Sequence, residues 1–126
     1  MKKYYYDKGV GIKNHKDLLA WKKAMKLSKY VYKITKKFPK VKQYRMISQL
    51  RRAVVSIPSN IAEKAARSSE KEFLQFLHVS LGSVAEVETQ LLLSKEFGYI
   101  NEIKMNKLGE VRRLILGLIK SIKIEN

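Results

Sequence analysis

The chain has 126 residues, a net charge of +16, 45% hydrophobic residues and no cysteine. This length corresponds to one domain, and the absence of cysteine excludes disulfides and thiolate metal sites. No apolar stretch approaches the roughly 20 residues that span a bilayer, and no signal peptide is visible. We therefore expect a cytoplasmic protein with one hydrophobic core and no membrane contact.

The positive charge is concentrated in one part of the sequence. Fifteen of the 27 basic residues lie in the first 45 positions beside only two acids, Asp7 and Asp17, so this stretch carries +13 of the +16. A lysine-rich solvated face is the ordinary explanation of such a run, but acidic residues usually rise with lysine in thermophilic proteins and do not rise here. A local excess of cations attracts polyanions, and this pattern favours contact with nucleic acid.

The sequence divides into an arm and a helical domain. Residues 1–14 show no helical period and predict a flexible basic arm, and residues 15–123 contain four amphipathic segments. The cluster Tyr4, Tyr5 and Tyr6 lies beside lysines and could stack on bases. Docking of this arm on a groove or a neighbouring subunit is the alternative that we favour.

The first predicted helix spans residues 15–37 and ends at Phe38-Pro39, because the residue before a proline is pushed out of the helical region. Its apolar stripe has helical spacing and consists of Leu18, Trp21, Met25, Ser28 and Tyr32, widened by Ala20, Ala24, Leu27, Val31 and Ile34. A separate stripe consists of Lys22, Lys26, Lys29, Lys33 and Lys37. These lysines repel one another, and a bound polyanion would neutralise them. We predict that they bind nucleic acid together with Arg112 and Arg113.

The second predicted helix spans residues 43–67, and Pro58 lies inside it. A proline there removes the backbone hydrogen bond to the carbonyl of Val54. The helix either bends at this point or ends and restarts with Asn60 as its cap. We favour one helix that is kinked at Pro58.

The last two predicted helices complete an all-α, up-down-up-down antiparallel four-helix bundle. Ser69 and Glu72 have capping-box spacing and open a helix over 70–97 that ends at Gly98. That helix is apolar on most of its circumference, which predicts burial against a second copy of the chain. Asn101 is predicted to open the fourth helix, 101–122, whose stripe consists of Leu108, Val111, Ile115, Leu118 and Ile122.

Catalytic, cofactor and metal motifs are absent from the sequence, so we expect no enzymatic activity, no cofactor and no bound metal. The two histidines, His15 and His78, are not at ligand spacing, and His78 is expected to be buried or at an interface. Glu88 falls in the apolar arc of its helix, where an unpaired carboxylate is costly. We predict a structural ion pair drawn from Arg51, Arg52, Glu63, Glu86 and Glu88, with an arginine of helix two as the partner of Glu88. Gly82-Ser83 is predicted to mark the close approach of another helix.

A set of short motifs resembles one known family. It includes Trp21-Lys22, Gln49-Leu50-Arg51-Arg52-Ala53, the SIPSNIAE stretch of residues 56–63, and Gly98-Tyr99-Ile100. Together the motifs resemble the four-helix-bundle proteins encoded in intervening sequences of 23S ribosomal RNA genes, over about residues 15–120. That family includes the accessory variability determinant proteins of diversity-generating retroelements. One departure is Lys64-Ala65, where the family often has a glycine.

The resemblance implies a homopentameric barrel with a basic surface and no activity of its own. In the retroelement branch it implies binding to a reverse transcriptase and to structured RNA or RNA/DNA. Our first hypothesis is therefore an oligomeric accessory protein that binds nucleic acid, with RNA preferred. The alternative is an oligomeric scaffold, encoded in a ribosomal RNA intervening sequence, whose basic face meets an acidic protein. A nuclease or another RNA-processing enzyme is a third and weaker hypothesis.

Overall fold

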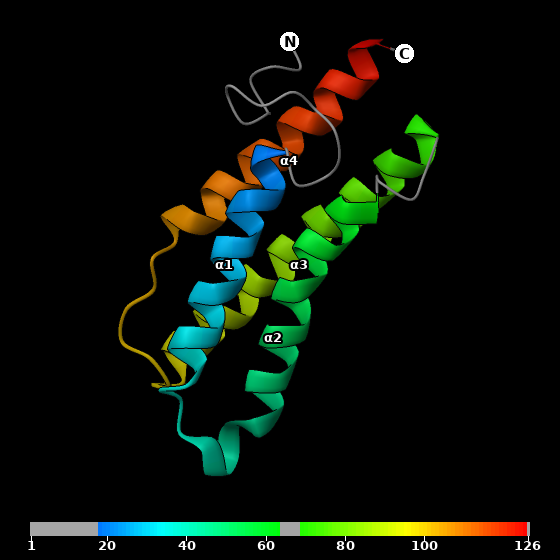
Figure 1. Cartoon of the computed structure of the whole chain (residues 1–126). Helices are drawn as coiled ribbons and strands as arrows, with labels where there is room; N and C mark the ends of the chain where they lie inside the picture. Colours follow the sequence, from blue (N-terminus) through cyan, green and yellow to red (C-terminus); the bar gives the residue numbers. More distant parts are fainter. Residues whose placement is uncertain (1–17, 64–68, 126) are drawn as a thin grey trace.

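The computed structural model describes residues 18–63 and 69–125, and these form four helices (Figure 1). Their bounds are α1, Leu19–Thr35; α2, Lys40–Ala62; α3, Glu70–Glu96; and α4, Asn106–Glu125. Helix α1 packs against α2 and α4, and α3 packs against the same two helices. No β-strand occurs in the described ranges. The predicted all-α four-helix bundle is confirmed. The predicted arm, residues 1–14, lies outside the described residues, as do the helical positions predicted for 15–17 and 64–67 and the Lys64-Ala65 departure.

The turn between α1 and α2 follows the prediction from Phe38-Pro39. Helix α1 ends at Thr35, and the Phe38 amide donates to the Thr35 carbonyl at 3.2 Å. Phe38 is buried and anchors the turn to the core. Pro39 has an extended backbone and precedes the first residue of α2, which begins three residues before the predicted start at residue 43.

Both ends of α3 have the predicted capping chemistry. The Ser69 hydroxyl accepts a hydrogen bond from the Glu72 amide at 3.2 Å, which satisfies a donor that the first turn of a helix leaves free. At the other end Gly98 has a φ of 80°, a conformation that side chains disfavour. The amides of Gly98 and Tyr99 then donate to the carbonyls of Lys95 and Ser94 at 3.0 and 2.9 Å. This double closure stops α3 and turns the chain toward α4.

The start of the fourth helix differs from the prediction. Helix α4 begins at Asn106, so Asn101 does not cap it and lies in the connection between α3 and α4. The Lys104 amide in this connection donates to the Tyr30 hydroxyl of α1 at 2.8 Å. Ile100 and Ile103 pack against the core from the same segment. These long-range contacts hold the segment extended, where the local sequence alone would allow a helical turn.

The core is formed by aliphatic side chains from all four helices. It includes Leu27, Val31, Leu50, Val54, Ile57, Leu77, Val84, Leu91, Leu108 and Ile115, each 1% exposed or less. Each such side chain contributes about 1.5–3 kcal/mol by leaving water. All five positions of the stripe predicted for the fourth helix are buried. Two positions of the stripe predicted for the first helix are not buried, since Met25 and Tyr32 are 38% and 39% exposed.

Two predictions about α3 are borne out only in part. His78 is exposed in the single chain, so it is not buried, and its place at an interface stays a prediction. Gly82 is also exposed, and a Cβ atom added there would meet no other atom within 4 Å. The close helix approach predicted for Gly82-Ser83 is found at Ser83, whose hydroxyl lies 2.9 Å from that of Ser56 on α2.

Helix α2 continues through Pro58, as the favoured prediction required, while the bend itself stays a prediction. Proline has no amide hydrogen, so the Val54 carbonyl loses its usual donor. The Ser28 hydroxyl of α1 lies 3.3 Å from this oxygen and 3.0 Å from the Ala24 carbonyl of α1. Because the hydroxyl has one proton, α1 and α2 share this donor between the two carbonyls.

The next three carbonyls of α2 also accept bonds from side chains. The Ser59 hydroxyl donates to Val55 at 2.8 Å, and the Asn60 amide donates to Ser56 at 2.8 Å. The buried Ser80 hydroxyl of α3 donates to the Ile57 carbonyl at 2.9 Å. Side chains from the 56–60 stretch, together with Ser28 of α1 and Ser80 of α3, therefore donate hydrogen bonds to the backbone carbonyls around the proline.

The pairing of Ser28 with Pro58 gives a test. We expect Ser28→Ala to lower the free energy of unfolding by about 1 kcal/mol, because the Val54 carbonyl then lacks a donor. In a Pro58→Ala background the same change should cost clearly less, since the amide of the new alanine can bond to Val54. Urea unfolding of the four chains measures this difference. Ser59→Ala, which removes an exposed local bond, serves as the control, and equal Ser28→Ala costs in both backgrounds would refute the pairing.

Candidate nucleic-acid interface

The lysine stripe lies on the outer surface of α1. Lys26, Lys29, Lys33 and Lys37 are all exposed, whereas Lys22 is partly buried and takes part in an interaction of its own. The buried residues of α1, such as Leu27 and Val31, lie on the opposite side of the helix because α2 and α4 pack there. The structure thus places Lys26, Lys29 and Lys33 on one solvent-facing stripe of α1, and Lys37 is exposed in the turn that follows the helix.

The edge of this stripe nearest α4 contains a neutralised lysine. The Lys23 ammonium lies 3.6 Å from a carboxylate oxygen of Glu110 on α4, and both side chains are partly exposed. Exposed pairs of this kind contribute little to stability. Glu110 nevertheless offsets the charge of Lys23. The pair marks the edge of the cationic surface of α1 on the side of α4.

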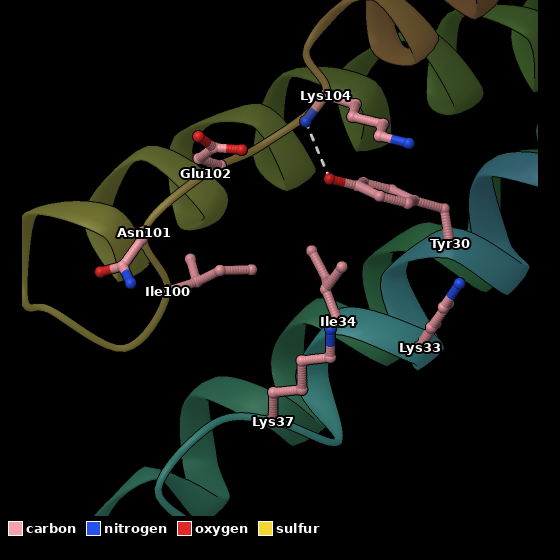
Figure 2. Close-up of a pocket in the computed structure, with 8 residues that line it drawn as sticks. All are labelled: Tyr30, Lys33, Ile34, Lys37, Ile100, Asn101, Glu102 and Lys104. Atoms are coloured by element: carbon pink, nitrogen blue, oxygen red, sulfur yellow. Dashed lines mark hydrogen bonds between the residues drawn. The ribbon is translucent and has the colours of Figure 1, made fainter.

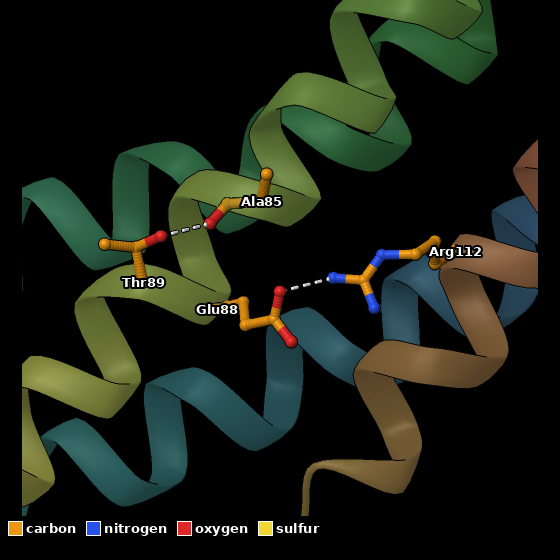
Figure 3. A network of polar contacts seen from close by, with 4 residues as sticks. All are labelled: Ala85, Glu88, Thr89 and Arg112. Atoms are coloured by element: carbon orange, nitrogen blue, oxygen red, sulfur yellow. Dashed lines mark hydrogen bonds and ion pairs between the residues drawn. The ribbon is translucent and has the colours of Figure 1, made fainter.

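Arg112 has a different role from the one predicted. Its guanidinium donates to a Glu88 carboxylate oxygen at 2.7 Å, linking α4 to α3 (Figure 3). Glu88 was expected to be buried and to pair with Arg51 or Arg52, but its side chain is 36% exposed and makes no ion pair with either. Glu88 lies at the edge of α3 that faces α4. The apolar arc predicted from the sequence is wider than the face that α3 buries, so a residue of this arc can be partly exposed. Arg113 is exposed, so it is the member of the predicted arginine pair that faces solvent.

The two arginines of α2 diverge, as neighbours on a helix must. The Arg51 guanidinium donates to the Thr35 hydroxyl at 3.0 Å and lies 4.5 Å from the centre of the Tyr32 ring. These contacts secure the last turn of α1, at the lower end of the lysine stripe. Arg51 therefore stabilises the structure through a hydroxyl and an aromatic ring, and not through a predicted carboxylate.

Arg52 and Glu86 line one shallow groove of about 420 Å³ between α2 and α3, beside Ser56 and Ser83. Glu86 accepts a hydrogen bond from the Gln90 amide at 3.3 Å. Glu63, at the end of α2, is partly buried and has an interaction of its own. Of the five residues predicted for a structural ion pair, Glu88 alone is found in an ion pair whose partner is identified, and that partner is Arg112.

A pocket of about 530 Å³ opens at the end of the lysine stripe, between the last turns of α1 and the connection that precedes α4 (Figure 2). It is lined by Tyr30, Lys33, Ile34, Lys37, Ile100, Asn101, Glu102 and Lys104. Of these residues, the sequence predicted a binding role only for Lys33 and Lys37. The prediction of a helix over 101–122 hid the approach of Asn101, Glu102 and Lys104 to α1, although Gly98 marks a chain reversal that could have indicated a loop here.

The described residues carry no cluster of three histidine or acidic side chains that could hold a metal ion. None of the described helices combines the length and the apolarity that crossing a membrane requires. The described surface carries exposed cations at the α1 lysines, at Arg113 on α4 and at Lys104 in the connection.

Comparisons with known proteins agree with this fold. A structural neighbour is the crystal structure of a protein of unknown function from the S23 ribosomal protein family of Bacteroides thetaiotaomicron. The two chains are 24% identical, with a TM-score of 0.71, and the match covers 81% of this chain and 96% of the other. A search of the curated proteins gives no significant match. The family model for the 23S rRNA-intervening sequence protein matches residues 16–121, so the chain belongs to that family.

Proposed function

We propose that the protein is a non-enzymatic, oligomeric protein that binds nucleic acid through α1, with structured RNA as the preferred ligand. The observation that supports this most strongly is the exposed set Lys26, Lys29 and Lys33 on one face of α1, with exposed Lys37 in the turn that follows. The family is described by its link to intervening sequences of 23S rRNA, which fits an RNA ligand.

The length of the stripe favours a polymer over a small anion. From Lys26 to Lys33 the helix rises about 10 Å. A duplex of that length presents about six phosphate charges. Lysine is a flexible point charge that suits phosphate and reads little sequence. The stripe should therefore give strong, salt-dependent binding that depends on the shape of the nucleic acid more than on its sequence.

Self-association would place several such stripes on one particle. Large apolar side chains stay exposed on the single chain, among them Val79 and Leu92 on α3 and Leu116 on α4, which are 51%, 48% and 45% exposed. We propose that these surfaces pack between copies, with the pentamer that the family resemblance implies as the expected form. Several copies of a weak phosphate site would then act together on one folded RNA.

A reverse transcriptase is a further proposed partner, in the case that the chain belongs to the retroelement branch of its family. The alternative function is a scaffold that presents the same lysines to an acidic protein. A pull-down with and without nuclease separates the two functions, because a protein partner stays bound after the nucleic acid has been digested. RNA incubated with the protein, with and without divalent metal, should stay intact if the protein is not an enzyme.

The lysine stripe predicts a defined loss of salt dependence. We expect Lys26→Gln, Lys29→Gln and Lys33→Gln together to weaken binding to a structured RNA, and each to reduce the slope of log K against log salt by about 0.7–0.9. Fluorescence anisotropy between about 50 and 200 mM salt measures the slope. Lys71→Gln with Lys95→Gln on α3 is the control, and an equal loss of slope per lysine in both sets would show that α1 is not the interface.

The oligomer is tested by sedimentation. The monomer has a mass of 14.7 kDa, so a pentamer should sediment as a particle of about five times that mass. We expect Leu92→Lys to dissociate it, because a charge cannot be buried in an apolar interface without a partner. Gln75→Lys, an exposed change on the same helix, should leave the oligomer intact. Sedimentation of the unmodified protein as a monomer would contradict the proposal.

A further inference from the structure

The pocket at the end of the lysine stripe combines an apolar floor with a cationic rim. Ile34 is 7% exposed and Ile100 is partly buried, and the two side chains point toward one another inside it (Figure 2). Lys33 on α1, Lys37 in the turn after α1 and Lys104 in the connection also line the pocket. The lining thus carries three lysines and a single carboxylate, that of Glu102, beside a small apolar surface.

The wall of the pocket is fixed by a contact between distant segments. The Tyr30 hydroxyl accepts the Lys104 amide at 2.8 Å, so the connection is tied to α1 at this point. The Lys107 ammonium lies 5.8 Å from the centre of the same ring, which adds another positive charge beside the pocket. The cavity is thus held open by a hydrogen bond that fixes one edge of its lining.

We propose that this pocket holds one unpaired nucleotide of the bound RNA, an inference that rests on the proposed function. Its volume of about 530 Å³ lies within the range of small-ligand sites. The phosphate would meet Lys33, Lys37 and Lys104, and the base would cover Ile34 and Ile100. Asn101 is exposed on the rim, and its amide can both donate to and accept from the edge of a base.

This placement explains how the surface would distinguish folded RNA from a uniform duplex. Phosphate contacts along α1 are equally available on any helical stretch. A base can enter a pocket only where it is unpaired, as in a bulge or a loop, which is where proteins usually read RNA. A bulge would therefore gain the contacts of the pocket in addition to those of the stripe.

The chemistry of the pocket also suits a free nucleotide, so the experiment uses three probes: a short RNA duplex, the same duplex with a bulge of unpaired uridines, and uridine monophosphate. We expect the full-length protein to bind the bulged RNA about five- to tenfold more tightly than the duplex. Asn101→Ala should reduce this preference and leave duplex binding unchanged, because the substitution removes the amide but alters no charge.

Two controls keep the result specific to the pocket. Gln75→Ala removes an exposed amide on α3 and should not change the preference. Thermal unfolding of Asn101→Ala should match that of the unmodified chain, because the side chain is exposed. Tyr30→Phe keeps the ring but loses the bond to the Lys104 amide, and should reduce the preference for the bulge without abolishing salt-dependent duplex binding.

The outcomes separate this inference from the proposed function. Equal, salt-dependent binding of both RNAs would refute nucleotide binding in the pocket and would leave the proposed α1 interface standing. Binding of uridine monophosphate that Asn101→Ala weakens, without a preference for the bulge, would show a free-nucleotide site and overturn the placement in RNA. Failure of both RNAs to bind would overturn the proposed function and this inference together.

Discussion

The loss of one backbone donor at Pro58 is compensated from a neighbouring helix, at a level of the bundle where α2 contacts both α1 and α3. The Val54 carbonyl is approached by Ser28 from α1, and the nearby Ile57 carbonyl accepts a bond from Ser80 on α3. A hydrogen bond to a buried carbonyl has a fixed direction and length, unlike apolar packing, which tolerates sliding and rotation. Helix α2 is therefore held in register with both of its neighbours at a single level of the bundle.

That register determines what α1 presents to solvent. Because Ser28 faces α2, the lysines on the far side of the helix must face outward. Arg51 repeats the constraint near the last turn, where it contacts Thr35 and the Tyr32 ring. The lysine stripe and the pocket at its end are thus positioned by contacts that lie on the other side of the same helix.

Most helix ends could be predicted from the sequence because they depend on neighbouring residues. The partners of side chains on different helices could not be predicted in this way. Ser69, Gly98 and Pro39 act through the backbone beside them, so the ends that they form could be predicted. Glu88 was paired with the wrong helix, because its partner depends on which face of α3 meets α4. The start of α4 was misplaced for a similar reason, since a contact with Tyr30, 74 positions away from Lys104, holds the connection extended. The lysine stripe could be predicted because its period is contained in one helix, but the pocket combines two distant segments.

The crowding of cations on α1 has a consequence for the protein without its ligand. The exposed lysines on one face of α1 repel one another, and dissolved ions screen that repulsion. The same ions compete for phosphate and weaken any hold on a polyanion. Higher ionic strength therefore has opposite effects on the free protein and on the complex. It stabilises the free protein and weakens the binding of the polyanion. The ionic strength of the cell would therefore set the balance between the free protein and the protein bound to its polyanion.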